Sequence, residues 1–226
     1  MGDIRLAAYY GLIPETVKGN LNVGLGIKIP TGNYQYKDVF QRPEGPELRY
    51  VDQSIQPGDG GWGVSAEFSF SHLVARNLYG YATGFYLFNP MNTNGVERSP
   101  NLTAGIPLSN EFSVTDQFLF RAGGRYVIHH NLQVGLGFRA EGIPAEDAIG
   151  DSDGWRRPGY IYSVEPSAIY TIKNKHTFGV NVPVALYRNR TKNTIDMTRS
   201  EMTGEDFHGD AAFSDWLLSV FYVVRF

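Results

Sequence analysis

Residues 21–29 read LNVGLGIKI, and along this stretch apolar residues alternate without a break with small or polar ones. The odd positions carry leucine, valine or isoleucine, whereas the even positions carry asparagine, glycine and lysine. Because successive side chains of a β-strand point to opposite faces, the stretch predicts a strand with one apolar and one polar face.

The same period of two recurs along the whole chain. We count nine such segments, at 4–12, 21–29, 62–70, 78–89, 117–126, 132–141, 160–171, 178–186 and 216–226. Most are about ten residues long, whereas strands of globular proteins usually have about five or six residues. A strand that crosses a membrane needs about 9–11 residues. The pattern therefore predicts an all-β protein, an antiparallel transmembrane β-barrel, and favours it over a soluble sandwich or a lipocalin-like barrel.

The composition agrees with an all-β chain and excludes several other classes. Glycine makes up 26 of the 226 residues, tyrosine and phenylalanine contribute 14 each, and cysteine is absent. Disulfide scaffolds, thiolate zinc sites and cysteine nucleophiles are thereby excluded. The net charge of −3 gives no basic surface for nucleic acid. The chain contains no run of about 18 apolar residues, so no transmembrane helix is predicted.

The links between the predicted strands alternate in length. Short links fall at 13–20, 72–77, 128–131 and 173–176, and long links fall at 31–60, 90–112, 142–158 and 190–212. Outer-membrane barrels have short periplasmic turns and long extracellular loops, so we expect the long links to lie together outside the cell.

The same alternation bears on the two ends of the chain. The last strand is expected to run down to the periplasm, and its Tyr222, Val224 and Phe226 resemble the signal read by the barrel-assembly machinery. The first strand then has to start outside, which gives an odd strand count, whereas bacterial barrels have even counts. Met1 is followed by Gly-Asp-Ile-Arg with no signal peptide. We therefore expect residues 1–226 to be one domain, a fragment of a 10- or 12-stranded barrel.

Six segments carry a family resemblance, namely GDIRL (2–6), NLNVGLGIKIPTGNY (20–34), QPGDGGWG (56–63), RAEGIP (139–144), RRPG (156–159) and YRNR (187–190). Together they resemble the MetA-pathway phenol-degradation family of bacterial outer-membrane transporters. The resemblance implies the outer membrane of a Gram-negative bacterium, with the lipid bilayer and lipopolysaccharide as surroundings. It also implies about 12 strands in total. A channel of this kind needs no cofactor.

Three functional hypotheses follow. The first is a passive channel for small hydrophobic or aromatic molecules. The second is a structural barrel with a plugged lumen that contacts other envelope components. The third, an outer-membrane hydrolase, depends on His208, which lies in an acidic loop between Asp206 and Asp210, and it is the weakest.

Charged residues at the polar positions of the strands are expected to face the lumen, because a charge on the lipid face costs roughly 2–4 kcal/mol at the midplane. Two interpretations stay open. The inward charges either brace the wall as salt bridges, which we favour, or form a selectivity lining for anionic or polar solutes. The eight residues are Arg5, Lys28, Glu67, Arg121, Arg125, Arg139, Glu141 and Glu165.

One long link contains three acidic residues that are candidates for binding calcium, Asp147, Asp151 and Asp153. Their spacing misses the register of a calcium loop, so ordinary turn chemistry is the favoured interpretation and no metal is expected. Arg156 and Arg157 follow directly, and we expect them to neutralise these acids. Such pairs are expected to fold the loop into the lumen as a constriction.

Overall fold

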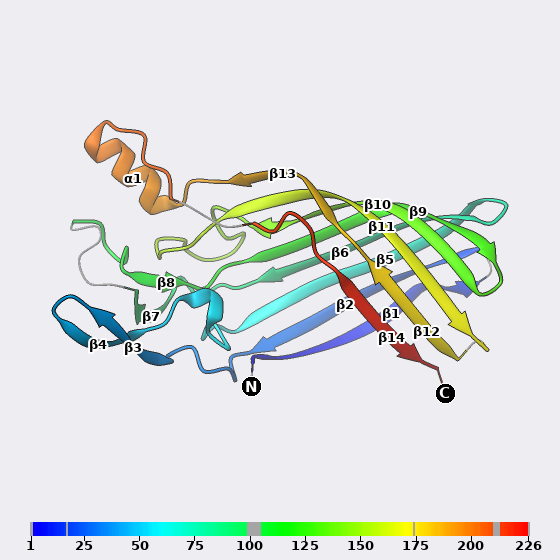
Figure 1. The fold of residues 1–226 in the computed structure, drawn as a ribbon, viewed down its shortest axis with the longest axis horizontal. Coiled ribbons are helices and arrows are strands. Elements are labelled where there is room, and N and C mark those ends of the chain that lie inside the picture. Colours follow the sequence, from blue (N-terminus) through cyan, green and yellow to red (C-terminus); the bar gives the residue numbers. More distant parts are fainter. Residues whose placement is uncertain (1, 17, 99–104, 174, 210–212, 226) are drawn as a thin grey trace.

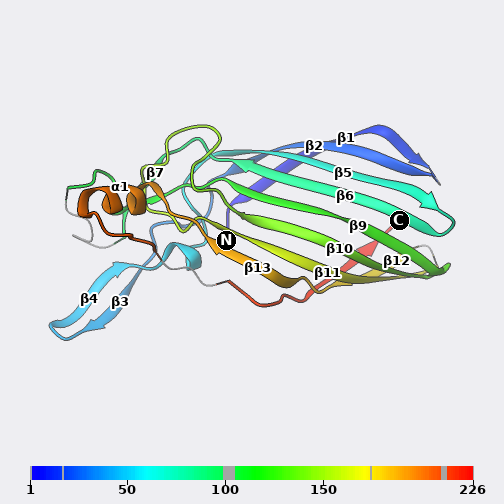
Figure 2. The ribbon, with the colours of Figure 1, turned by 90° about the horizontal axis from the view of Figure 1, so that it is seen from above.

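A computed structural model describes residues 2–16, 18–98, 105–173, 175–209 and 213–225. Ten strands form one antiparallel sheet whose order is β1-β2-β5-β6-β9-β10-β11-β12-β14, with β13 also paired to β11. Figures 1 and 2 show these long strands side by side. They are β1 (Ile4–Thr16), β2 (Gly19–Ile29), β5 (Gly63–Ala75), β6 (Leu78–Phe88), β9 (Gln117–His129), β10 (Leu132–Ile143), β11 (Gly159–Ile172), β12 (His176–Asn181), β13 (Val184–Arg190) and β14 (Ser219–Val224).

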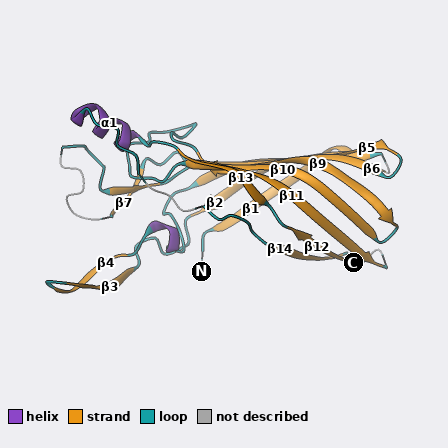
Figure 3. Ribbon diagram, turned by 45° about the horizontal axis from the view of Figure 1, so that its top comes forward, coloured by secondary structure: helices purple, strands orange, loops and turns teal. Residues whose placement is uncertain are grey.

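The sheet arches into a half-barrel (Figure 3). Its edge strands are β1 and β14, and within the part of the chain that the structure describes they are not hydrogen-bonded to each other. The predicted all-β antiparallel sheet is confirmed, and the sheet is not closed.

One predicted strand, 178–186, is broken in two. Val182 and Pro183 separate β12 from β13, although both pieces pair with β11, and the register of β13 shifts by one residue between Ala185 and Tyr187. Proline has no N–H to donate to a neighbouring strand, so the ladder is interrupted there. The prediction of nine strands in the sheet was therefore wrong by one.

The two ends of the sheet differ as expected. Figure 1 shows the tight turns gathered at one end and the long links at the other. The strands extend further into the turns than predicted, since β1 runs to Thr16 and β2 begins at Gly19. The opposite end, where the long links lie, is called the loop end below.

The loop end holds structure that the sequence analysis treated as loops. Two hairpins form there, β3 (Lys37–Arg42) with β4 (Gly45–Tyr50), and β7 (Thr93–Glu97) with β8 (Glu111–Ser113). A short 3-10 helix spans Gln53–Ile55, and helix α1 spans Thr194–Thr203. Asn193 caps α1 and exchanges hydrogen bonds with Asp196, a capping box that satisfies the free N–H groups of the first turn.

The two faces of the sheet carry opposite chemistry. On the convex face the apolar side chains are exposed, with exposed fractions of 68% for Leu25 and 73% for Val220. Phe68 and Val134 are also exposed there, whereas Val182 lies half-buried in the strand break. Fully buried apolar side chains gather instead at the loop end, among them Val96, Phe112 and Val114. The sheet therefore has no apolar core packed on its convex face in the described residues.

Candidate functional site

The cross-strand register places all eight predicted charges on one face of the sheet. Arg5 lies beside Lys28, Arg121 beside Arg139, and Glu141 beside Leu119. The remaining charged positions follow the same alternation on β5, β9 and β11. This is the concave face.

Four of these charges form one network in the middle of the face. The guanidinium of Arg121 pairs with Glu165 from across strand β10. Arg139 binds Glu141 through two hydrogen bonds of 2.9 and 2.5 Å and reaches Glu165 at 3.4 Å. Glu165 is only 1% exposed, so both arginines neutralise one buried carboxylate. The four side chains of this group are thus joined by salt bridges across three strands.

Aromatic side chains supply partners for two further charges. The guanidinium of Arg125 lies 4.3 Å from the ring centre of Tyr81, a cation–π contact. A Cβ atom at Gly137 would come within 2.2 Å of the Tyr81 hydroxyl, so glycine leaves room for that ring. The Tyr9 hydroxyl donates to Glu67 at 2.8 Å. These pairings could not be predicted from the alternation, because aromatic residues occur on both faces of the strands.

The two charges nearest the loop end differ from each other. Lys28 is buried and pairs with Asp59, which comes from the loop and not from the wall. Arg5 is exposed and lies 5.8 Å from the ring centre of Phe85. Among the described residues no carboxylate lies within ion-pair distance of Arg5.

A buried polar cluster ties the loops together. Arg156 binds both carboxylate oxygens of Asp147 at 2.7 and 2.6 Å, and both side chains are fully buried. Asp147 also accepts the backbone N–H of Asp116 at 2.8 Å. Asp116 in turn accepts from Tyr86 at 2.8 Å and from the N–H of Asn89 at 2.6 Å. The loop end is thus fastened to strand β6.

The calcium candidates are not brought together. Asp147 is occupied by Arg156, Asp153 accepts from Asn92 at 2.9 Å, and Asp151 is exposed. Across the described ranges no three acidic or histidine side chains form a group that could hold a metal ion. The expected neutralisation holds for Arg156 but was wrong for Arg157, which binds a different loop.

Arg157 joins two loops that are far apart in the sequence. Its guanidinium makes two hydrogen bonds of 3.0 Å to Asp52, 105 residues away, and both side chains are about one-third exposed. Burial raises the pKa of Asp52, but hydrogen bonds from Ser54 and from Arg157 outweigh it, so this pKa lies below its ordinary value. The guanidiniums of Arg157 and Arg98 both lie over the indole of Trp155, at 4.7 and 3.8 Å from the ring centre.

His208 is engaged with the backbone. A ring nitrogen, Nε2, lies 2.6 Å from the carbonyl oxygen of Arg190. The side chain of Asp206 pairs with Lys192, whose hydrogen bond and charge lower the pKa of that exposed carboxyl. Asp210, the other acid named for the hydrolase hypothesis, lies outside the described residues.

The C-terminal strand carries two of the three proposed assembly-signal residues. Tyr222 is exposed on the convex face, and its hydroxyl lies 2.7 Å from Nδ1 of His176. Val224 pairs with His176 across the strands, and Phe226 lies outside the described residues.

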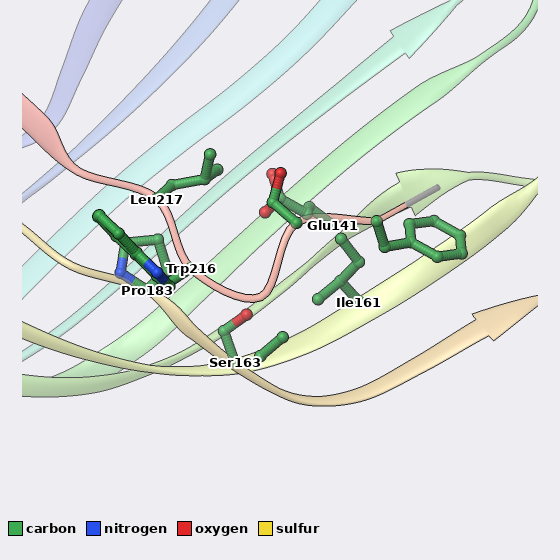
Figure 4. Close-up of a pocket in the computed structure, with 9 residues that line it drawn as sticks. Glu141, Ile161, Ser163, Pro183, Trp216 and Leu217 are labelled. Carbon is green, nitrogen blue, oxygen red and sulfur yellow. The ribbon is translucent and has the colours of Figure 1, made fainter. Parts of the chain in front are cut away.

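The concave face is hollowed in several places. A cavity of about 490 Å³ lies at the loop end between Arg5 and Arg157, and a cavity of about 420 Å³ shares Gln117, Ile143 and Arg157 with it. A smaller cavity of about 250 Å³ is shown in Figure 4, where the segment with Trp216 and Leu217 passes over Glu141 and Ser163.

No protein-family model matches the chain, and no curated protein matches it either. The resemblance to outer-membrane transporters therefore stays a prediction. None of the described helices has both the length and the apolar character needed to cross a membrane.

Proposed function

We propose that this chain forms the greater part of a bacterial outer-membrane β-barrel that acts as a passive channel for small solutes. The observation that carries the proposal is the contrast between the faces of the sheet. Exposed leucine, valine and phenylalanine cover the convex face, while paired charges line the concave one. Lipid is the solvent that suits the first face, and a narrow aqueous lumen suits the second.

The open edges are part of the same proposal. Unpaired backbone groups in lipid cost several kcal/mol each, so strands β1 and β14 need partners in a membrane. We propose that one or three further strands close the seam. Because β12 and β13 lie end to end beside β11, the ten strands fill nine positions, and the closed barrel has 10 or 12. Open sheet edges at both ends of the strand order support this.

A matched pair of substitutions on β2 tests the orientation of the wall. Leu25→Arg puts a charge on the convex face and should reduce the membrane-inserted fraction, at a cost of roughly 2–4 kcal/mol near the midplane. Asn22→Arg puts the same charge on the concave face and should insert normally. Outer-membrane fractionation and heat-dependent gel mobility measure both. Equal tolerance of the two arginines would overturn the proposal.

A plugged barrel is the second candidate, and the packing of the loop end favours it. Phe112, Val114 and the Arg156–Asp147 pair are all fully buried where the loops meet. Planar-bilayer recordings separate the two functions. Steady openings that a solute can block support the channel, and a silent protein that folds correctly supports the plug.

A further inference from the structure

The two adjoining cavities of about 490 and 420 Å³ at the loop end are together called the loop-end hollow. We infer that this hollow is a binding subsite for a small aromatic carboxylate, with Arg5 as the carboxylate-binding residue. The inference deepens the proposed function, since it assumes that this hollow lies on the solute path. It combines three features: a cation without an acidic partner, a wall of aromatic and aliphatic side chains, and enough space for a ligand.

Four acidic side chains line the two adjoining cavities of this hollow. Asp52 pairs with Arg157, Asp59 pairs with Lys28, and Glu141 pairs with Arg139. Asp3 accepts the backbone N–H groups of Gly32 at 2.9 Å and of Asp59 at 3.4 Å. Each of these carboxylates already has donors of its own.

Arg5 is the cation that remains. Within the described ranges its guanidinium has no ion pair, and its contact is with the Phe85 ring at 5.8 Å. An arginine that lies over an aromatic ring keeps its N–H donors free at the edge of the guanidinium plane. Those donors match the two oxygens of a carboxylate, which arginine binds in a bidentate manner.

The space beside Arg5 is suited to a ring. The two loop-end cavities, of about 490 and 420 Å³, share Gln117, Ile143 and Arg157 and so adjoin each other. Phe85, Leu119, Ile161 and Phe213 line the second cavity, and its volume lies in the range of small-molecule sites. A carboxylate on Arg5 would place an attached ring against Phe85, which lies under the same guanidinium.

Titration calorimetry on the folded, detergent-solubilised chain tests the inference with three probes of similar size. Benzoate has both the ring and the charge, benzyl alcohol lacks the charge, and cyclohexanecarboxylate lacks the aromatic ring. We expect benzoate to bind more tightly than either of the others. Equal affinity for benzoate and benzyl alcohol in the unmodified protein overturns the inference without any variant.

Substitutions then locate the site. Arg5→Gln should weaken benzoate binding by roughly tenfold or more, because a charge-assisted bidentate contact is lost. Arg5→Lys should give an intermediate loss. Phe85→Leu should abolish the preference for benzoate over cyclohexanecarboxylate. Arg42→Gln removes the same charge from the exposed β3–β4 hairpin and should leave binding unchanged, and equal weakening by Arg5→Gln and Arg42→Gln overturns the assignment.

The failure of this inference is distinguishable from the failure of the channel. Bilayer conductance without selective benzoate binding overturns the subsite and leaves the channel proposal standing. Selective binding to Arg5 in a protein that never conducts supports the subsite and overturns the channel.

Discussion

The loop end and the strand wall both pair opposite charges, but in different surroundings. Arg156 and Asp147 at the loop end are fully buried and bind each other, and the Ser113 hydroxyl and the Asp116 N–H supply further hydrogen bonds. In the wall, Arg121 and Arg139 keep part of their surface exposed toward the concave side while sharing the buried Glu165. The loop pair therefore holds a structure together, whereas the wall network also sets the charge that a solute meets.

This difference predicts unequal costs of disruption. A buried pair left with one partner retains an uncompensated charge, which costs several kcal/mol. A partly exposed pair can be rehydrated, so its loss costs much less. The following predictions run from the first case to the last.

Arg156→Ala should have the largest effect. It leaves the carboxylate of Asp147 buried without a cation, so we expect a loss of about 3–5 kcal/mol in the free energy of unfolding. Limited proteolysis should detect loosened loops in 90–98 and 142–158, and denaturant titration should give the free energy. Arg42→Ala, whose contact with Glu47 at 3.8 Å is exposed, is the control and should change stability by less than about 1 kcal/mol. Similar losses in both variants would remove the distinction between the regions.

Glu165→Gln should have a smaller effect on stability and a clear effect on ion selectivity. The amide still fills the space and accepts one hydrogen bond, so we expect a cost of about 1–3 kcal/mol. Arg121 and Arg139 then lose a shared negative charge, and the lumen should favour anions more strongly. The reversal potential in a potassium chloride gradient measures this change.

The double variant Arg121→Gln/Glu165→Gln restores the balance of charge. Its reversal potential should return toward that of the unmodified protein. An unchanged reversal potential in Glu165→Gln would mean that these charges only brace the wall and that ions do not pass them.

The wall could be predicted from the sequence because its periodicity is local. Every second residue of 21–29 is apolar, and that alone fixes which side of the strand Lys28 faces. The break at Pro183 does not show in the alternation, although proline has no N–H to donate to a neighbouring strand. Helix α1 was not predicted either, although Asn193 and Asp196 have the spacing of a capping box, which indicates the start of a helix.

The partners of the charges could not be predicted in the same way. Asp52 and Arg157 are 105 residues apart, and Lys28 pairs with Asp59 from a long loop. Periodicity gives the face of a side chain but not its neighbour across two strands or its distance from a loop. At the loop end only the Arg156–Asp147 pair, nine residues apart, could be expected from the sequence, and the other contacts came from the three-dimensional arrangement.

Loss of the Asp52–Arg157 contact should have the smallest effect on the free energy of unfolding. Its pH dependence shows how a partly exposed ion pair differs from the buried Arg156–Asp147 pair. The pKa of Asp52 is lowered in the folded protein, so the contact stabilises the fold above the ordinary aspartate pKa of about 3.9. That contribution is lost as the pH falls through the lowered value. Because both side chains are about one-third exposed, solvent screening limits it to about 1 kcal/mol.

Hydrogen exchange of residues 51–61, followed from pH 7 to below pH 3, measures this loss. Since about 1 kcal/mol corresponds to a change of about fivefold, we expect the protection of the segment to be constant down to pH 4 and to fall about fivefold below it, while Asp52→Asn should show the lower protection at every pH. Opening of the unmodified protein at or above pH 4 would mean that Arg157 does not hold Asp52 in its charged form. A contact that stays closed at every pH above 4 also fixes the width of the loop-end hollow, so the affinity of benzoate should not change between pH 5.5 and 8.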